Sequence, residues 1–181
     1  MALANAEELR TTLTGSPHAL GRVFARHAYG MRSWVDQIGR KLSLFERPEA
    51  KATAARIVGD NARHMLLFRE RAAALGIDPD AYRVPPEGEA IYERLEQLVD
   101  PAEIAAFALG SLEHFSELLA AYRGAAHGES AAVIDAVAAD VDEHRAALRA
   151  LLRGEPEERR REAERLYEAR ELAEVRSYAE R

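Results

Sequence analysis

Apolar residues recur along most of this chain at alternating spacings of three and four residues, which is the period of one face of an α-helix. The strict alternation of apolar and polar residues that is typical of strands is absent from the sequence. Alanine, leucine, glutamate and arginine dominate the composition and favour helices. The sequence therefore predicts an all-α fold. The predicted helices cover residues 5–13, 16–45, 48–75, 87–99, 101–124, 131–153 and 157–181.

Four of these predicted helices are long, and Pro48 and Pro101 each lie in the first turn of one of them. Short connections fold the four helices into two hairpins, and a single connection of about 25 residues, 76–100, joins the hairpins. This is the topology of a four-helix bundle with one crossover. We therefore predict one bundle over residues 1–154, including a short N-terminal helix, and a charged C-terminal helix over residues 155–181.

One motif occurs twice within the apolar stripes, 80 residues apart. It reads Asp-x-x-x-His and comprises Asp60 with His64 in the first copy and Asp140 with His144 in the second. An internal repeat of this kind suggests two related helical hairpins with equivalent histidines. Both histidines continue the apolar stripe of their helix, so they are predicted to face the core.

The histidines belong to a predicted polar layer halfway along the bundle. Counting about 1.5 Å per residue from the hairpin turn places His27 within about one helical turn of His64, and His144 falls near the same level. Glu113 lies beside the main stripe of its helix, which leaves two orientations open: toward the crowded interior, or along a flank. His114 is predicted to lie on the outside.

In these motifs the chain resembles the ferritin-like superfamily, in the wide sense that includes rubrerythrins and di-iron hydroxylases. The segments Asp-Asn-Ala-Arg-His at residues 60–64 and Asp-Val-Asp-Glu-His at residues 140–144 look like that family's Asp-Glu-x-x-His motif read twice. The resemblance covers about residues 17–153. It implies a ferritin-like four-helix bundle with a buried site for a pair of metal ions.

The resemblance also implies a role for each matching residue. His64 and His144 would bind metal, and Glu113 would be the carboxylate of the third long helix. Asp60 and Asp140 would each hydrogen-bond the histidine of the opposite motif and so orient it.

The chain departs from the family pattern at the glutamates. Asn61 and Val141 stand where the motif has glutamate, and His27 occupies the glutamate position of the first helix. A di-iron centre needs several carboxylates to balance two cations in a core of low dielectric constant. A standard di-iron site is therefore not expected.

Two interpretations of the polar layer follow directly from its composition. In one, the layer is purely structural, because a buried histidine paired with an aspartate leaves no polar group unsatisfied. In the other, the layer holds a single Fe, Mn or Zn ion, with His27, His64, Glu113 and His144 as candidate metal ligands.

A third interpretation keeps a cavity without a metal. His64 and His144, oriented by Asp60 and Asp140, are then candidate catalytic residues that act as general base and acid near neutral pH. The small side chain of Val141 leaves room for a ligand beside them.

Composition limits the functional classes. The 181 residues fit one domain, and the net charge of -6 gives no support to nucleic-acid binding. The lack of cysteine excludes disulfides and thiolate metal sites. No apolar run of about 20 residues and no signal peptide are expected, so the prediction is a cytoplasmic protein that does not bind membranes.

The function predicted from the sequence is that of a small-molecule enzyme or binding protein that uses a cavity lined by histidine and aspartate and has lost the standard di-iron site. One alternative is a metal-dependent oxidoreductase of the ferritin-like class. Another is a non-catalytic assembly protein, with the helix of residues 155–181 joining copies into a dimer or larger homo-oligomer.

Overall fold

Every regular element among the described residues is a helix, which confirms the all-α prediction. The computed structural model describes residues 6–16, 18–80, 82, 86–152 and 157–167. The labelled elements are α1 (Ala6–Gly15), α2 (Ala19–Lys41), η1 (Leu42–Leu44), α3 (Pro48–Ala74), α4 (Pro86–Gln97), α5 (Pro101–Ala125) and α6 (Gly128–Leu151). Residues 157–167 form a further helix.

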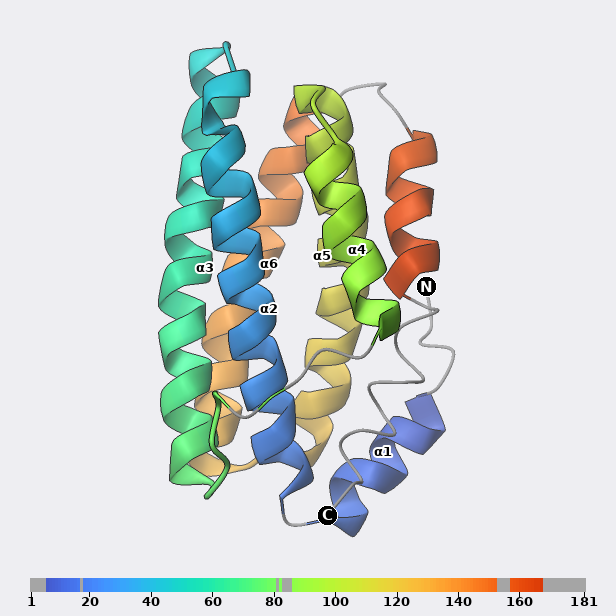
Figure 1. The fold of residues 1–181 in the computed structure, drawn as a ribbon. Coiled ribbons are helices and arrows are strands. Elements are labelled where there is room, and N and C mark those ends of the chain that lie inside the picture. The colour runs from blue at the N-terminus through green and yellow to red at the C-terminus, as the bar shows by residue number, and fades with distance from the viewer. Residues whose placement is uncertain (1–5, 17, 81, 83–85, 153–156, 168–181) are drawn as a thin grey trace.

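The four long helices α2, α3, α5 and α6 lie side by side and form a helical bundle (Figure 1). The 3₁₀ turn η1 lies between α2 and α3, and only a short connection separates α5 from α6. The long connection between the hairpins carries α4, which contacts α2. Contacts between α3 and α6 bring the two motif copies together.

Local sequence signals set the ends of these helices. The Asp100 carboxylate accepts hydrogen bonds from the backbone N–H groups of Ala102 and Glu103, at 2.8 and 3.1 Å, and so caps α5. Just after the C-terminal end of α3, Gly76 adopts a positive φ of 78°. The N–H of Ile77 then reaches the carbonyl of Ala72, at 3.0 Å, in the arrangement that commonly terminates helices.

The buried faces of α3 and α6 are the ones that the apolar stripes predicted. The buried residues of α3 are Ala54, Ile57, Asn61, His64, Phe68 and Ala72. Those of α6 are Ser130, Ala131, Ile134, Val137, Val141, His144 and Leu148. The core positions of His64 and His144 are therefore confirmed.

Helix α5 is buried on several sides, since α1, α6 and residues 157–167 all contact it. His114 is consequently only 2% exposed, and its ring lies 5.3 Å from that of Tyr167. The prediction that His114 lies on the outside is wrong, because the predicted C-terminal helix packs over this face of α5, a placement that the apolar stripes do not indicate.

Helix α5 is the most apolar of the four long helices. Among the described residues, it is a helix long and apolar enough to cross a membrane by length and composition alone. Two thirds (67%) of its most apolar window is buried by the rest of the protein. Packing against the neighbouring helices accounts for this composition.

The helix of residues 157–167 packs on its own chain, beside α4 and α5 (Figure 1). The Arg94 guanidinium of α4 binds the Glu162 carboxylate at 2.7 Å, and Arg159 binds Glu103 of α5 at 2.8 Å. Ala163 is fully buried. The remainder of the predicted C-terminal helix, residues 168–181, lies outside the described residues.

Candidate functional site

Two crossed hydrogen bonds join α3 to α6 where the two motif copies meet. The Nε2 atom of His64 lies 2.8 Å from a carboxylate oxygen of Asp140, and Nε2 of His144 lies 2.8 Å from a carboxylate oxygen of Asp60. The centres of the two imidazole rings are 6.5 Å apart. The structure thus contains the pairing that the resemblance implies, with each aspartate bound to the histidine of the other motif.

Arginine side chains cover the outer side of this pair. Arg63 Nη2 lies 2.5 Å from a carboxylate oxygen of Asp140 and 3.3 Å from one of Asp60. Arg56 lies 3.6 Å from Asp60 and also contacts Glu143. The two aspartate side chains are about one fifth exposed. They form the surface end of the layer, and the arginines lie over them.

Burial and charge settle the protonation of the first pair. Burial lowers the pKa of His64 below its ordinary value, although the hydrogen bond to Asp140 opposes this effect. Partial burial raises the pKa of Asp140, but the hydrogen bonds from His64 and Arg63 outweigh it, so the pKa lies below its ordinary value. The balance is the same for Asp60. At neutral pH His64 is neutral and donates its Nε2 hydrogen to an ionised carboxylate.

The other ring nitrogens of the two histidines have no partner among the described residues. Nδ1 of His64 and Nδ1 of His144 are both buried, and neither makes a hydrogen bond with that part of the chain. In the neutral tautomer of His64 this atom carries a lone pair that can accept a hydrogen bond or bind a cation.

The four predicted metal ligands do not come together. Within the described part of the chain, no three histidine, aspartate or glutamate side chains lie close enough to hold one ion. Both nitrogens of His27 are already engaged, with Arg26 at 2.6 Å and Tyr122 at 3.0 Å. Glu113 takes the flank orientation and pairs with Arg149 at 2.7 Å. The orientation of α5 explains this result, since it places His114 inward instead.

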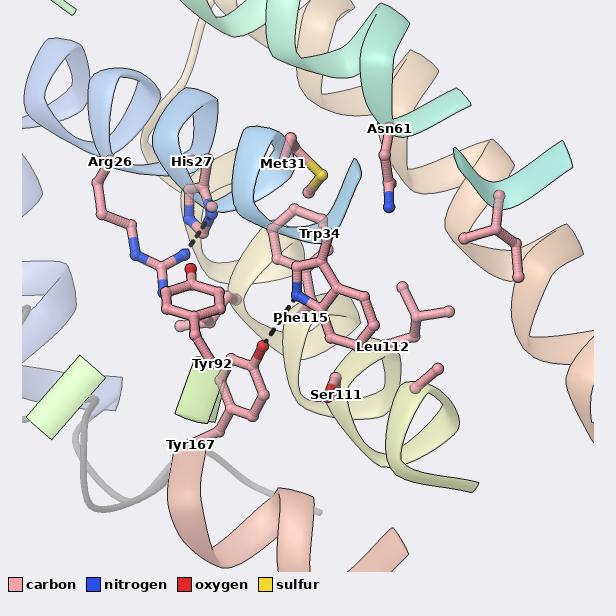
Figure 2. Close-up of a pocket in the computed structure, with 14 residues that line it drawn as sticks. Arg26, His27, Met31, Trp34, Asn61, Tyr92, Ser111, Leu112, Phe115 and Tyr167 are labelled. Carbon is pink, nitrogen blue, oxygen red and sulfur yellow. Dashed lines mark hydrogen bonds between the residues drawn. The ribbon is translucent and has the colours of Figure 1, made fainter. Parts of the chain in front are cut away.

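A cavity lies next to the histidine layer, between α2, α3 and α5 (Figure 2). Its volume is about 40 Å³, and Tyr92 of α4 and Tyr167 contribute to its wall. The lining residues are Arg26, His27, Gly30, Met31, Trp34, Ile57, Asn61, Tyr92, Ala108, Ser111, Leu112, Phe115, Leu118 and Tyr167. His64, His144 and both aspartates lie outside this lining, so the cavity and the crossed pairs are neighbouring features rather than one site.

Most polar groups around the cavity have partners within the protein. Arg26 binds His27, the Ser111 hydroxyl donates to the Phe107 carbonyl at 2.8 Å, and the Trp34 indole N–H donates to the Tyr167 hydroxyl at 3.3 Å. These interactions hold the wall in place.

Asn61 is the exception. Its side chain is only 6% exposed and extends from α3 into the cavity (Figure 2). Its amide makes no hydrogen bond with the described residues. The amide atoms reach the space of the cavity, so they are available to hydrogen-bond a molecule that enters it.

Sequence reasoning found His27 and Asn61 of this lining and missed several others. Arg26 and Ser111 sit on faces that the stripes leave out, while Tyr92 and Tyr167 lie on segments distant in sequence. No signal in the sequence marked these four residues. Tyr92 and Tyr167 reach the cavity only through the packing of α4 and residues 157–167.

Comparison with known proteins assigns no family to the chain: no family model matches it, and neither does any curated protein or solved structure. The functional argument therefore rests on the geometry of the cavity and of the crossed pairs.

Proposed function

We propose that this protein binds a small molecule in the cavity between α2, α3 and α5. The observation that carries the proposal is Asn61, whose buried amide faces the cavity without a partner. A bound molecule can hydrogen-bond both the N–H groups and the oxygen of this amide.

The composition of the wall supports the same conclusion. Ligand sites are mostly apolar with a few convergent polar groups, and here Met31, Leu112 and Phe115 accompany Asn61 and Arg26. The volume of about 40 Å³ corresponds to roughly three water molecules. A ligand of more than a few atoms therefore requires the wall side chains to move, and Trp34 and Leu112 are the half-buried ones among them.

The only tryptophan of the chain provides the test, because Trp34 lines the cavity. Untagged protein is titrated with hexanol, hexanamide, hexanoate and hexylamine while the Trp34 fluorescence is followed. We expect saturable binding of at least one compound with a stoichiometry of one, weakened at least tenfold by Asn61→Leu. Gln37→Leu, on the same bundle but away from the cavity lining, is the control and should bind as the wild type does. Absence of saturable binding by all four compounds contradicts the proposal.

The metal-dependent oxidoreductase is the second candidate, and the unpartnered Nδ1 atoms of His64 and His144 favour it. Each imidazole forms a hydrogen bond from its Nε2 atom to a carboxylate, as metal-binding histidines commonly do with the ring nitrogen that does not bind the metal. These two donors suit a single Zn²⁺ or similar ion. They do not fit a di-iron centre of the ferritin-like type, because Asn61 and Val141 replace its glutamates.

Calorimetry with Zn²⁺, Fe²⁺ and Mn²⁺ on untagged protein separates the two candidates. Binding of one ion near stoichiometry that is lost in both His64→Ala and His144→Ala favours the metal protein. Ligand binding to the cavity without any such metal binding favours the first proposal. The assembly alternative is judged by deleting residues 155–181: loss of a homo-oligomer, with Asn61→Leu silent in every assay, would favour it.

A further inference from the structure

Ser111 of α5 is a second polar group of the cavity wall, and its hydrogen bond within the helix defines what it offers a ligand. The side chain is only 4% exposed, and its hydroxyl donates to the Phe107 carbonyl at 2.8 Å. A hydroxyl group has one hydrogen and two lone pairs. Because this hydrogen is used within α5, the Ser111 oxygen accepts a hydrogen bond from a molecule in the cavity and has none to give.

Asn61 reaches the same cavity from α3 (Figure 2). Its amide carries N–H donors next to a carbonyl acceptor, and it makes no hydrogen bond with the described residues. An amide edge of this kind forms two parallel hydrogen bonds with any group that has a donor beside an acceptor, as asparagine does with adenine in DNA recognition. Asn61 therefore favours a ligand that presents an N–H and an acceptor atom on one edge.

The size of the cavity limits the group that lies between these two side chains. Its volume of about 40 Å³ corresponds to roughly three water molecules, and a carboxamide group, with its carbon, oxygen and nitrogen, is of this size. A group that fills so small a space lies against the side chains that line it, Asn61 and Ser111 included.

We propose that the ligand is a primary carboxamide, R–CO–NH₂, whose head group is held between Asn61 and Ser111. The carbonyl oxygen and the N–H on the same side of the C–N bond pair with the Asn61 amide. The second N–H points away from that edge and donates to the Ser111 oxygen. The inference rests on the proposed function and adds the chemical class of the ligand to it.

Other uncharged head groups match only part of this pattern. An alcohol has a single hydrogen to donate and a ketone has none, so each leaves Ser111 or part of the Asn61 amide without a partner. A secondary amide in its ordinary trans form has its N–H on the side away from the carbonyl oxygen, and it therefore loses the edge that pairs with Asn61. An NH₂ group beside a carbonyl provides all three hydrogen bonds.

The rest of the wall suits an apolar substituent R. Met31, Leu112 and Phe115 line the cavity with carbon and sulfur atoms, and burial of apolar surface against them contributes to affinity. The substituent therefore adds to the strength of binding, whereas the head group determines which molecules bind.

The test compares hexanamide with 2-heptanone, in which a methyl group takes the place of the NH₂ group and the shape is kept. Both compounds, and N-methylhexanamide, are titrated into untagged protein while the Trp34 fluorescence is followed. We expect hexanamide to bind at least tenfold more tightly than either of the others. Binding of 2-heptanone or of N-methylhexanamide as tight as that of hexanamide overturns the proposal.

Replacing Ser111 by alanine removes one acceptor from the cavity. Ser111→Ala should weaken hexanamide binding at least threefold and leave 2-heptanone binding unchanged. Ser33→Ala is the matched control and should change neither, because the Ser33 hydroxyl also donates to the carbonyl four residues earlier, that of Tyr29 at 3.2 Å, but lies on α2 outside the cavity lining. Each variant loses only a hydrogen bond within its own helix, so both should fold.

The outcomes separate this inference from the proposed function. Hexanamide binding that is unchanged in Ser111→Ala overturns the carboxamide proposal. Hexanol binding that depends on Asn61, combined with equal affinities for hexanamide and 2-heptanone, rejects this inference and leaves the proposed function standing. Failure of every compound to bind rejects both.

Discussion

The two motif copies differ at one residue position that decides the chemistry of the interior, Asn61 in α3 and Val141 in α6. Both residues are buried. Val141 packs in the hydrophobic core with Ile134 and Val137, whereas the Asn61 amide faces a cavity. A side chain that served packing alone would be apolar at both positions, as Val141 is. In our proposal, this difference between equivalent residues marks the side of the bundle at which a ligand binds.

A prediction at the residue scale concerns the pH dependence of stability that His64 causes. Because burial lowers its pKa in the folded state, the unfolded chain binds a proton at His64 more readily than the native protein does. The contribution of His64 to stability is therefore complete above about pH 6.5 and is lost as the pH falls toward the lowered pKa. Urea unfolding followed by circular dichroism should give a lower free energy of unfolding at pH 5.5 than at pH 7.5.

Replacing the histidine separates this effect from general acid sensitivity. In His64→Gln the decrease in stability between pH 7.5 and 5.5 should be smaller than in the wild type. His127→Gln, at an exposed position, should retain the full decrease. A pH dependence that is the same in His64→Gln and the wild type would contradict the described environment of His64.

At the scale of the elements, the close contact between α5 and the helix of residues 157–167 completes the cavity. Gly110 permits this contact: a Cβ atom there would lie 2.4 Å from the Arg160 carbonyl oxygen and 3.1 Å from the Ala163 Cβ. The same helix carries Tyr167, which holds the Trp34 indole. A short peripheral helix thus supplies a hydrogen-bond partner to Trp34, which lines the cavity.

Gly110→Ala should therefore displace this helix. We expect a loss of about 1–3 kcal/mol in the free energy of unfolding, the usual cost of overpacking, and faster hydrogen exchange in residues 157–167. Gly59→Ala is the control, since a Cβ at Gly59 meets no atom within 4 Å. There the alanine should stabilise α3 by about 0.5–1 kcal/mol. Equal stability of Gly110→Ala and Gly59→Ala would show that the contact with α5 is absent in solution.

At the scale of the whole molecule, α2, α3 and α5 form most of the cavity wall, and Tyr92 of α4 and Tyr167 complete it. The bundle stripes and the core positions of His64 and His144 could be predicted, because α3 and α6 each bury a single face and show a clear helical period. Helix α5 could not be oriented in the same way, since burial on several sides removes that period, and the placement of His114 failed for this reason. Arg26, Tyr92 and Tyr167 could not be assigned to the cavity because only tertiary packing brings them there.

The central claim is that Asn61 serves a ligand and not the fold, and the stability of the unliganded protein tests it most directly. Asn61→Leu keeps the approximate shape of the side chain and puts carbon in place of an amide that has no hydrogen-bond partner among the described residues. Because the cavity wall is mostly apolar, the free energy of unfolding in urea should rise by about 0.5–2 kcal/mol, while the Trp34 fluorescence titration shows that ligand binding is lost. Gln37→Leu should change neither quantity appreciably. A fall in the free energy of unfolding of Asn61→Leu by 1 kcal/mol or more, with ligand binding retained, would show that Asn61 is a structural residue and would contradict the account.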